Sequence, residues 1–478
     1  MHSRAVFRDG ARNTAQRPLL SMDFKYMALR SLAKLVMATL IATSPSVFGA
    51  ETAGFLTVEQ RAEDFNRFCR FVEEEYAYFD LKRTDWDRTC RFYAPQVGSA
   101  TNRAAFVELL ELALGELYDS HAHLGTNTRR SYRLVPTQSD LFATWSNGVA
   151  ILSAVRRKSG AEDAGLLPGM EVVAINGEPI ETVLASIEPK FLSRQDPAAR
   201  EWALNVALAG RRDLETTRLS TRTGGRLQAF EFVPTTLAPK ALLSHRTIAN
   251  VGYIRMNNSL GEHALVQAFD QAISDMSAVR ALVIDLRDTP SGGNTAVARG
   301  LMGRLVKCTL PYQRHELVSE YRSTGIRRLW VEYVTPRSTP FLKPVVVLVG
   351  PWTGSMGEGM AIGLNATHGA PVLGRPMAHL LGANGEIVLP HSKIVVRIPT
   401  EKLFHVDGTP RQAFVPRAIP SSSPASTTRD RELSFAIDFA RKMSRLKNPS
   451  IERTCPGEPG QASHVKRPVS GIAERRPK

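Results

Sequence analysis

Ser355 is the residue whose type and position most directly indicate chemistry. It follows a continuous apolar run, Pro344 to Val349, which ends at Gly350 and is typical of a strand buried on both faces. The next residues open a helical pattern, so we expect Ser355 at a strand-to-helix turn. There a hydroxyl is accessible, and free N–H groups with the positive end of the helix dipole stabilise an oxyanion. The position therefore predicts a serine nucleophile.

A structural role explains the same serine without chemistry. Glu358 stands three residues after Ser355, which is the spacing of a helix capping box. Thr353 occupies the place of the first glycine in the G-x-S-x-G nucleophile elbow, so that motif is not met. From these residues alone, nucleophile and helix cap both stay open.

Two histidines are candidates for proton transfer. His121 and His123 follow a predicted helix that ends near Leu117, and an imidazole with an ordinary pKa of about 6.5 suits a general base. Residues two apart in an extended segment share a face, so the pair also has the spacing of two metal ligands. No further cluster of ligand residues accompanies them, and we expect neither a metal nor another cofactor.

The length of 478 residues suggests several domains, preceded by a targeting segment. Residues 1–50 contain scattered basic residues and then a short apolar stretch, Leu35 to Thr43, followed by small residues. This pattern predicts a secretory signal peptide, with translation beginning at Met1, Met22 or Met27. We therefore expect a periplasmic or secreted protein without stable membrane insertion once the signal is removed. An uncleaved anchor is the alternative.

The formal charge of +15 does not indicate a nucleic-acid partner. Residues 1–50 carry seven Lys/Arg and two Asp/Glu, and residues 445–478 carry eight and three, so each terminus accounts for +5 and the remaining +5 belongs to residues 51–444. No basic stripe with interleaved aromatic residues appears. Residues 446–478, rich in Pro, Gly, Arg and Lys, are predicted to be a disordered basic tail.

The four cysteines are compatible with export. Cys69 and Cys90 fall within one predicted helical segment, so we expect them to be close enough for a disulfide, with buried free thiols as the alternative. Cys308 and Cys455 have no partner nearby in sequence.

Residues 51–130 are predicted to form an N-terminal helical domain. Apolar residues recur at three- and four-residue intervals from Phe65 to Tyr76 and again from Phe106 to Leu117. Between these stretches, Thr84 or Asp85 is expected to cap an intervening helix.

Residues 131–235 change to short apolar strands with turn residues. Their motifs, Ala164-Gly165-Leu166, Pro168-Gly169 and Ile175-Asn176-Gly177, resemble a PDZ domain, although Met170 stands where such domains usually carry Asp. A PDZ-like module offers a sheet edge that adds an extended peptide as one more strand. The alternative is a structural module whose groove is filled by its own insertion, Glu188 to Glu215.

Residues 236–445 alternate strands and helices and therefore predict an α/β core. A strand from Val251 precedes a helix from Glu262 to Met276. A second strand ends in a glycine turn at Gly292-Gly293, and the Pro344 strand leads to Ser355. The two glycine-bearing strand ends should lie near each other.

The order of these motifs resembles the serine-peptidase superfamily of C-terminal processing peptidases, the tricorn protease core and the interphotoreceptor retinoid-binding protein modules. The matching segments, in chain order, are Tyr76-Ala-Tyr-Phe, Asp85-Trp-Asp, Leu117-Tyr-Asp-Ser-His, the PDZ-like module, Val251-Gly-Tyr-Ile, Asp285-Leu-Arg-Asp-Thr-Pro-Ser-Gly-Gly-Asn, Ser355-Met-Gly-Glu and Gly382-Ala-Asn-Gly. The resemblance implies a multi-domain α/β protein whose catalytic core is the ββα spiral shared with Clp proteases and crotonases.

The resemblance also implies catalytic roles. Ser355 matches the nucleophile and Glu358 the acidic residue after it. The processing-peptidase branch uses a downstream lysine, but Gly374 to Gly385 contains none, whereas the tricorn-like branch uses a Ser-His pair that Ser120-His121 fits. His121 is therefore assigned as general base, with Glu358 or Ser120 orienting its imidazole.

The donors of the oxyanion hole and a fourth catalytic group match the family pattern less closely. We expect the N–H of Met356, with that of Gly292 or Gly293, to bind the oxyanion, although glycines in such a turn can serve backbone shape alone. Tricorn-like enzymes have a further glutamate where this chain has Gln412, and an Asp where it has Arg417. The fourth group is therefore replaced or lost.

Three functions follow as hypotheses. The first is an exported serine endopeptidase acting on proteins or peptides. The second is a catalytically weak relative that binds peptides or small apolar ligands in the same cleft. The third is a serine hydrolase acting on esters or non-peptide amides. The substrate and the oligomeric state do not follow from the sequence.

Overall fold

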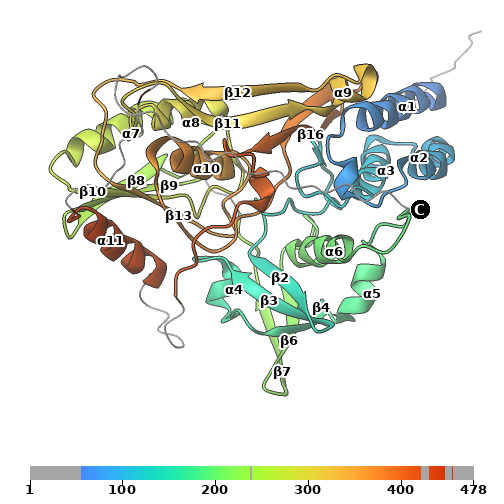
Figure 1. Ribbon diagram of the computed structural model, residues 1–478. Coiled ribbons are helices and arrows are strands. Elements are labelled where there is room, and N and C mark those ends of the chain that lie inside the picture. The colour runs from blue at the N-terminus through green and yellow to red at the C-terminus, as the bar shows by residue number, and fades with distance from the viewer. Residues whose placement is uncertain (1–54, 237–239, 421–429, 447–454, 456–478) are drawn as a thin grey trace, which may run out of the picture. The chain divides into compact units, whose positions relative to one another are not determined.

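The computed structural model describes residues 55–236, 240–420, 430–446 and Cys455 (Figure 1). The predicted signal peptide at residues 1–50 lies outside these residues, as does nearly all of the predicted tail at 446–478. Within the described ranges, no helix is both long and apolar enough to cross a membrane.

Helices dominate the first described region, as its apolar periodicity predicts. Its elements are α1 (Val58–Glu75), the 3-10 helix η1 (Phe79–Leu81), α2 (Trp86–Tyr93), the 3-10 helix η2 (Ala94–Ser99) and α3 (Arg103–Gly115). Thr57 and Gln60 form a capping box at the start of α1. Asp85 caps α2 by accepting the Arg88 N–H at 2.9 Å, which confirms one of the two expected caps.

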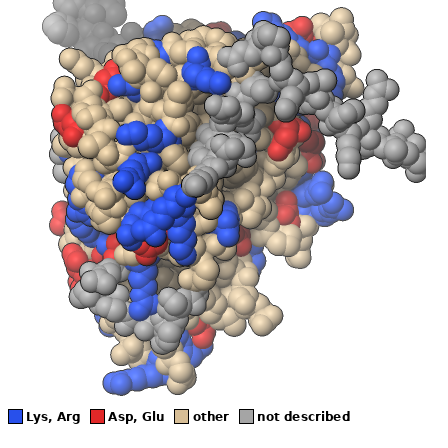
Figure 2. Space-filling model, turned by 60° about the vertical axis from the view of Figure 1, so that its left-hand side comes forward, with Lys and Arg blue, Asp and Glu red and all other residues tan. Residues whose placement is uncertain are grey.

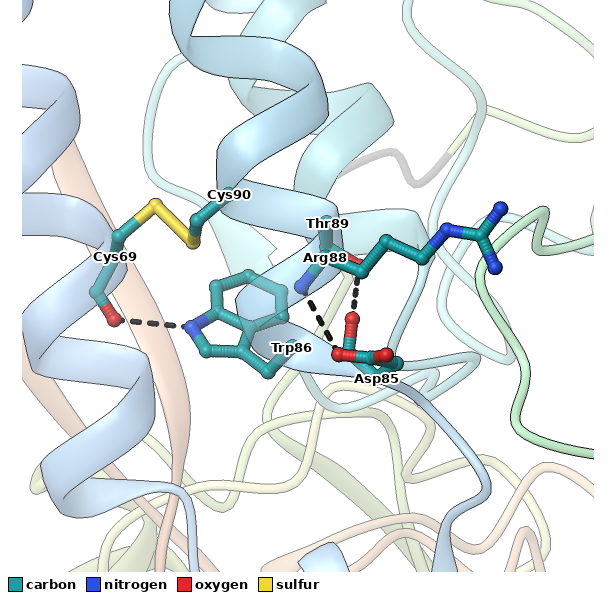
Figure 3. Close-up of a disulfide and its surroundings, with 6 residues drawn as sticks. All are labelled: Cys69, Asp85, Trp86, Arg88, Thr89 and Cys90. Carbon is teal, nitrogen blue, oxygen red and sulfur yellow. Dashed lines mark hydrogen bonds between the residues drawn. A yellow bond between two sulfur atoms is a disulfide. The ribbon is translucent and has the colours of Figure 1, made fainter.

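Cys69 of α1 and Cys90 of α2 form the expected disulfide, with a Cα separation of 6.2 Å (Figure 3). The indole of Trp86 lies beside it and donates to the Cys69 carbonyl at 3.0 Å. A second disulfide joins Cys308 to Cys455, which are 147 residues apart. No sequence pattern predicts this second pairing.

Residues 141–232 form a six-stranded sheet with its own apolar core. Its strands are β2 (Leu141–Ser146), β3 (Val149–Val155), β4 (Glu171–Ile175), β5 (Glu178–Pro179), β6 (Thr217–Thr223) and β7 (Arg226–Phe232), and its helices are α4 (Gly160–Asp163), α5 (Ile180–Ala185) and α6 (Pro197–Ala209). β2 is an edge strand, but the Asn205 amide of α6 pairs with both the N–H and the carbonyl of Ala143, each at 3.0 Å. At Ala143 the edge is therefore occupied by the chain's own insertion.

A parallel sheet with helices on both faces confirms the predicted α/β core (Figure 1). Its order is β14 (Val372–Gly374), β13 (Val345–Val349), β10 (Ala281–Asp285), β9 (Val251–Met256) and the antiparallel edge strand β8 (Leu243–Ile248). One face packs against α7 (Ala264–Asp275), α8 (Thr295–Met302) and α10 (Met356–His368), and the other against α11 (Arg431–Met443). Every residue of β10 and β13 is buried, which explains why both strands are apolar apart from Asp285 at the end of β10.

A third sheet connects the helical region to the α/β core. It contains β1 (His123–Leu124), β16 (Val395–Phe404), β11 (Leu310–Leu317), β12 (Arg328–Val334) and β15 (Ala383–Val388), with α9 (Val318–Thr324) between β11 and β12. His123 of β1 is paired with Arg397 of β16. This pairing places the end of the helical region beside the α/β core.

The described residues, from residue 55 onward, belong to one compact unit. Buried polar contacts cross its expected internal boundaries. The Arg156 guanidinium lies 2.9 Å from Asp288, and the Trp352 indole donates to the Ser139 carbonyl at 2.8 Å. The boundaries near residues 130 and 235 and the PDZ-like character of residues 131–235 stay predictions.

Candidate active site

Ser355 occupies the predicted turn between β13 and α10. Its backbone has φ of 50° and ψ of −113°, a left-handed conformation that a non-glycine residue adopts at an energetic cost. Strained residues of this kind cluster at functional sites. The turn therefore presents Ser355 as a nucleophile elbow does, although Thr353 replaces the glycine of that motif.

Glu358 is buried and binds the backbone of two segments. Its Oε2 accepts the Ser355 N–H at 2.9 Å and the Leu380 N–H at 3.2 Å. The capping box is therefore formed, as the spacing of Ser355 and Glu358 predicts. This structural role does not exclude a catalytic role for Ser355. Burial raises the pKa of Glu358 to about 7, against the opposing effect of Arg411.

His121 is held in the tautomer that a general base requires. Its Nδ1–H donates to the Leu381 carbonyl at 2.6 Å, and this leaves the lone pair on Nε2. The backbone of the same residue is fixed by Asp119, which accepts its N–H at 2.9 Å, and by Asn384, which donates to its carbonyl at 2.9 Å. The expectation that Glu358 or Ser120 orients the imidazole is therefore corrected, because the Leu381 carbonyl binds Nδ1.

The imidazole is neutral under ordinary conditions. Burial, together with the nearby cation of Arg411, lowers the pKa of His121 to about 4. The ordinary value of about 6.5, on which the assignment as base was argued, does not apply at this position. A neutral imidazole can still accept a proton from serine, and its basicity is lower than that of an exposed histidine.

The segment 380–382 connects the two candidate catalytic residues. Its Leu380 N–H binds Glu358, and its Leu381 carbonyl binds His121. Arg411, in the 3-10 helix η3 (Arg411–Ala413), is 3% exposed and donates to the carbonyls of Leu380 and Gly382 at 2.9 and 2.7 Å. Arg411 thus braces the segment on which both residues depend.

The glycine turn lies directly against Ser355, as the sequence predicts. A Cβ placed on Gly292 would lie 2.4 Å from the Ser355 Cβ and 2.9 Å from its Oγ, so only glycine allows this approach. The Gly292 N–H already donates to the Thr289 carbonyl at 3.1 Å within the turn. Of the two predicted glycine donors, Gly292 is thus engaged within the turn, whereas Gly293 lines the cavity together with Met356.

Ser355 and His121 line the same cavity, which has a volume of about 690 Å³. Ser120, His123, Gly293 and Met356 line it as well. A second cavity of about 270 Å³ shares Ser120 and His123 and extends between α3 and α6. The expected site residues are thus brought to one place by segments far apart in sequence.

Other expected groups are placed elsewhere. Gln412 is not among the residues that line this cavity, and its backbone carbonyl accepts from His379 at 2.6 Å. No lysine lines the cavity in the described chain. Lys393 instead donates to the Pro390 carbonyl, and Lys402 pairs with Asp80, each at 2.8 Å.

Among the described residues, no group of three or more His, Cys, Asp and Glu side chains is arranged so that it could hold a metal ion. The His123 Nδ1 lies 3.0 Å from the His121 carbonyl, and burial lowers the pKa of His123.

Several residues of the site escaped the sequence analysis. Arg411 directly precedes Gln412, but no sequence pattern distinguishes a buried arginine from an exposed one. Asp119 was within a quoted motif, yet its bonds to the His121 N–H and to the Tyr76 hydroxyl, at 2.9 and 2.8 Å, depend on the packing of α1. His315, Glu332 and Glu401 also line the cavity and come from three different strands.

Two family models match this chain. The model of Peptidase family S41 matches residues 250–415, and that of the Tricorn protease C1 domain matches residues 57–115. No curated protein matches the chain significantly in sequence.

Solved structures share the fold at low sequence identity. Mature CPAF complexed with lactacystin is 15% identical, with a TM-score of 0.52 over 81% of this chain and 98% of that chain. The photosystem II D1 C-terminal processing protease is 16% identical, with a TM-score of 0.50 over 76% of this chain and 94% of that chain.

Proposed function

We propose that this chain is an exported serine endopeptidase of peptidase family S41, in its C-terminal processing and tricorn-like group, and that it cleaves proteins or peptides. The family makes it a serine-type peptidase. The choice of endopeptidase, the histidine base and the export are our inferences.

In the proposed reaction, Nε2 of His121 takes the proton of the Ser355 hydroxyl as Oγ attacks the peptide carbonyl. The oxyanion forms against the N–H groups of Met356 and Gly293 at the start of α10, where the helix dipole is favourable. The imidazolium then gives its proton to the leaving amine, and water releases the acyl group by the same route in reverse.

The observation that carries this proposal is the double role of the segment 380–382. It binds Nδ1 of His121 at Leu381 and, through Glu358, the N–H of Ser355. The base and the nucleophile are thus oriented by one short piece of backbone beside one cavity.

Export is supported by the cysteines. All four described cysteines are paired in disulfides, and disulfides persist mainly in oxidising compartments such as the periplasm. The apolar stretch at Leu35 to Thr43 is the second support, although it lies outside the described residues. Fractionation of cells that make the full chain tests this inference, and retention in the cytoplasm would contradict it.

A catalytically weak binding protein is the second candidate. It is favoured by Gln412, which stands where tricorn-like enzymes have a glutamate and does not line the cavity. In that case peptides would bind near Ser355 without turnover.

Cleavage of casein and of a mixed peptide library by the purified chain separates the candidates. We expect cleavage within the peptides by the wild type and none by Ser355→Ala, with the stability of the variant changed by no more than about 1 kcal/mol, the usual contribution of a cap. Binding without cleavage would favour the second candidate. Cleavage of esters alone would indicate a different serine hydrolase.

A further inference from the structure

One wall of the catalytic cavity carries charged groups that the proposed reaction does not use. His315 of β11, Glu332 of β12 and Glu401 of β16 all line this cavity. The three strands are neighbours in one sheet, with β11 between β12 and β16. The groups therefore form one continuous surface.

His315 binds both glutamates and is covered by its surroundings. Its Nδ1 lies 2.9 Å from Glu401 Oε2, and its Nε2 lies 3.5 Å from Glu332 Oε2. Its ring stacks on Trp330, with centroids 4.8 Å apart. Burial opposes the charged ring, but the hydrogen bonds with the two glutamates outweigh it and raise the pKa of His315.

The accessible charge of this wall is negative. The His315 side chain is only 7% exposed, whereas those of Glu332 and Glu401 are 20% and 28% exposed. The hydroxyls of Tyr312 and Thr295 also bind Oε2 of Glu332. Although burial acts in the opposite direction, the hydrogen bonds from His315, Tyr312 and Thr295 lower the pKa of Glu332 to about 2, so this carboxylate stays ionised.

The cations around the same cavity are already engaged. Arg397 pairs with Glu386 at 2.9 Å. Arg411 is buried and donates to the backbone carbonyls of segment 380–382. Because two carboxylates face a single imidazole, the wall carries a net negative charge in either protonation state of His315, and a cationic ligand can neutralise it.

This wall begins close to the nucleophile. Gly359 lies one helical turn after Ser355 in α10, and its N–H donates to the Ser355 carbonyl at 3.0 Å. A Cβ on Gly359 would lie 3.2 Å from Oε1 of Gln313, which is paired with Glu332 across the strands. A substrate side chain near the scissile bond can therefore reach the wall.

We propose that Glu332 and Glu401 form a subsite for a lysine or arginine side chain of the substrate, close to the scissile bond. This inference rests on the proposed peptidase function and adds a class of substrate to it. A long side chain with a terminal cation fits a cavity that is lined both by Ser355 and by these two carboxylates. The peptide bond that is cleaved is then flanked by a basic residue.

The test compares pairs of fluorogenic peptides that differ only by Arg or Leu at one position, moved in turn through the three residues on each side of the cleaved bond. At one position we expect the wild type to show a higher kcat/KM for Arg than for Leu. Glu332→Gln should lower this ratio at least about tenfold, as expected when one partner of a partly buried charge pair is lost. Glu401→Gln should lower it as well.

Glu316→Gln is the matched control. Glu316 follows His315 on β11, and successive strand residues point to opposite faces, so it lies outside the cavity and pairs with Arg327. The control should leave the ratio unchanged. Equal rates for Arg and Leu peptides in the wild type, or an unchanged ratio in folded Glu332→Gln and Glu401→Gln, would overturn the subsite.

Binding to Ser355→Ala, measured by calorimetry with the same peptides, separates this inference from the proposed function. Tighter binding of the Arg peptide, lost in Ser355→Ala combined with Glu332→Gln, supports the subsite even where the wild type cleaves nothing. Cleavage without any preference for Arg overturns the subsite and leaves the peptidase function intact.

Discussion

His121 shows how a buried environment changes a residue whose type alone was informative. The sequence suggested a histidine base with an ordinary pKa, and the position of the residue indeed brings it to the cavity of Ser355. Burial and Arg411 then lower its pKa to about 4, while the Leu381 carbonyl fixes its tautomer. The imidazole is therefore a weaker base than an exposed histidine, but it is unprotonated, and so able to accept a proton, at every pH above about 5.

The pH profile of kcat/KM tests this change. We expect the acidic limb that belongs to the base near pH 4, not near pH 6.5. Glu358 titrates at about 7, so an inflection there is assigned to Glu358 and should vanish in Glu358→Gln. A limb near pH 6.5 that persists in Glu358→Gln would contradict the buried neutral imidazole.

The same shift has a consequence for stability. Between about pH 4 and pH 6.5 the unfolded chain binds a proton at residue 121 that the folded chain does not bind, so unfolding becomes more difficult as the pH rises through this window. In urea titrations at several pH values, His121→Gln should reduce this part of the pH dependence. If the free energy of unfolding of His121→Gln depended on pH as steeply as that of the wild type, other groups would be responsible for the pH dependence.

At the scale of elements, the segment 380–382, which lies between β14 and β15 in the chain, contacts both the residues just before β1 and the start of α10. It carries no catalytic side chain, yet its backbone groups bind His121 and Glu358. Arg411 holds it from the side of η3. Backbone contacts of this kind position a site without leaving a motif in the sequence.

Arg411→Met tests this connection. The change removes two hydrogen bonds and a cation that lowers the pKa of both His121 and Glu358. We expect kcat to fall by at least about tenfold, a typical effect of losing the support of a general base, and the acidic limb of kcat/KM to move to higher pH. If Arg411→Met were less stable but the acidic limb of its kcat/KM profile stayed at the same pH, Arg411 would have only a structural role.

The Cys69–Cys90 disulfide, which joins two helices, is expected to stabilise the fold. It closes a loop of 21 residues between α1 and α2. By the chain-entropy model, replacing both cysteines by serine should lower the free energy of unfolding by about 3 kcal/mol. Urea denaturation of the double variant measures this, and an unchanged midpoint would contradict it. Reducing agent should affect the variant less than the wild type, with the Cys308–Cys455 bond as the remaining target.

At the scale of the whole molecule, charged groups join segments that the sequence separates. On the face shown in Figure 2, Lys and Arg side chains gather in groups with some Asp and Glu beside them. Independently of that view, the Asp288 carboxylate meets Arg156 and Arg255 at 2.9 Å and Lys240 at 3.4 Å. The pair with Arg156 links residues 141–232 to the α/β core.

Asp288→Asn should weaken this link. The side chains of Arg156 and Asp288 are 8% and 9% exposed, so the change leaves a buried cation without its counter-charge, at a cost of about 3 kcal/mol in unfolding free energy. Burial opposes the effect, but Arg156 and its neighbours lower the pKa of Asp288. Its contribution is therefore present above the ordinary Asp pKa of about 3.9 and is lost as the pH falls through the lower folded value. Urea or thermal denaturation measures this difference. Equal free energies of unfolding for the wild type and Asp288→Asn would contradict this account.

Local patterns of the sequence predicted a large part of the fold, and long-range packing decided the rest. The apolar runs at β10 and β13, the cap at Asp85 and the turn at Ser355 all depend on neighbours in sequence. The Leu381 carbonyl, the buried Arg411 and the wall of Glu332 and Glu401 depend on strand register and on contacts over long separations. The pairing of Cys308 with Cys455 is of the same kind.

The central claim is that His121 activates Ser355, and covalent labelling tests it most directly. Intact-mass spectrometry after exposure to a fluorophosphonate should show one adduct on the wild type, at Ser355, and none on Ser355→Ala. His121→Ala should slow labelling by orders of magnitude, while His123→Ala, its neighbour in the same cavity, should change it little. Equal labelling rates in wild type and His121→Ala, or an essential Lys393 or Lys402 with activity rising only above about pH 9, would contradict the claim and favour a lysine base.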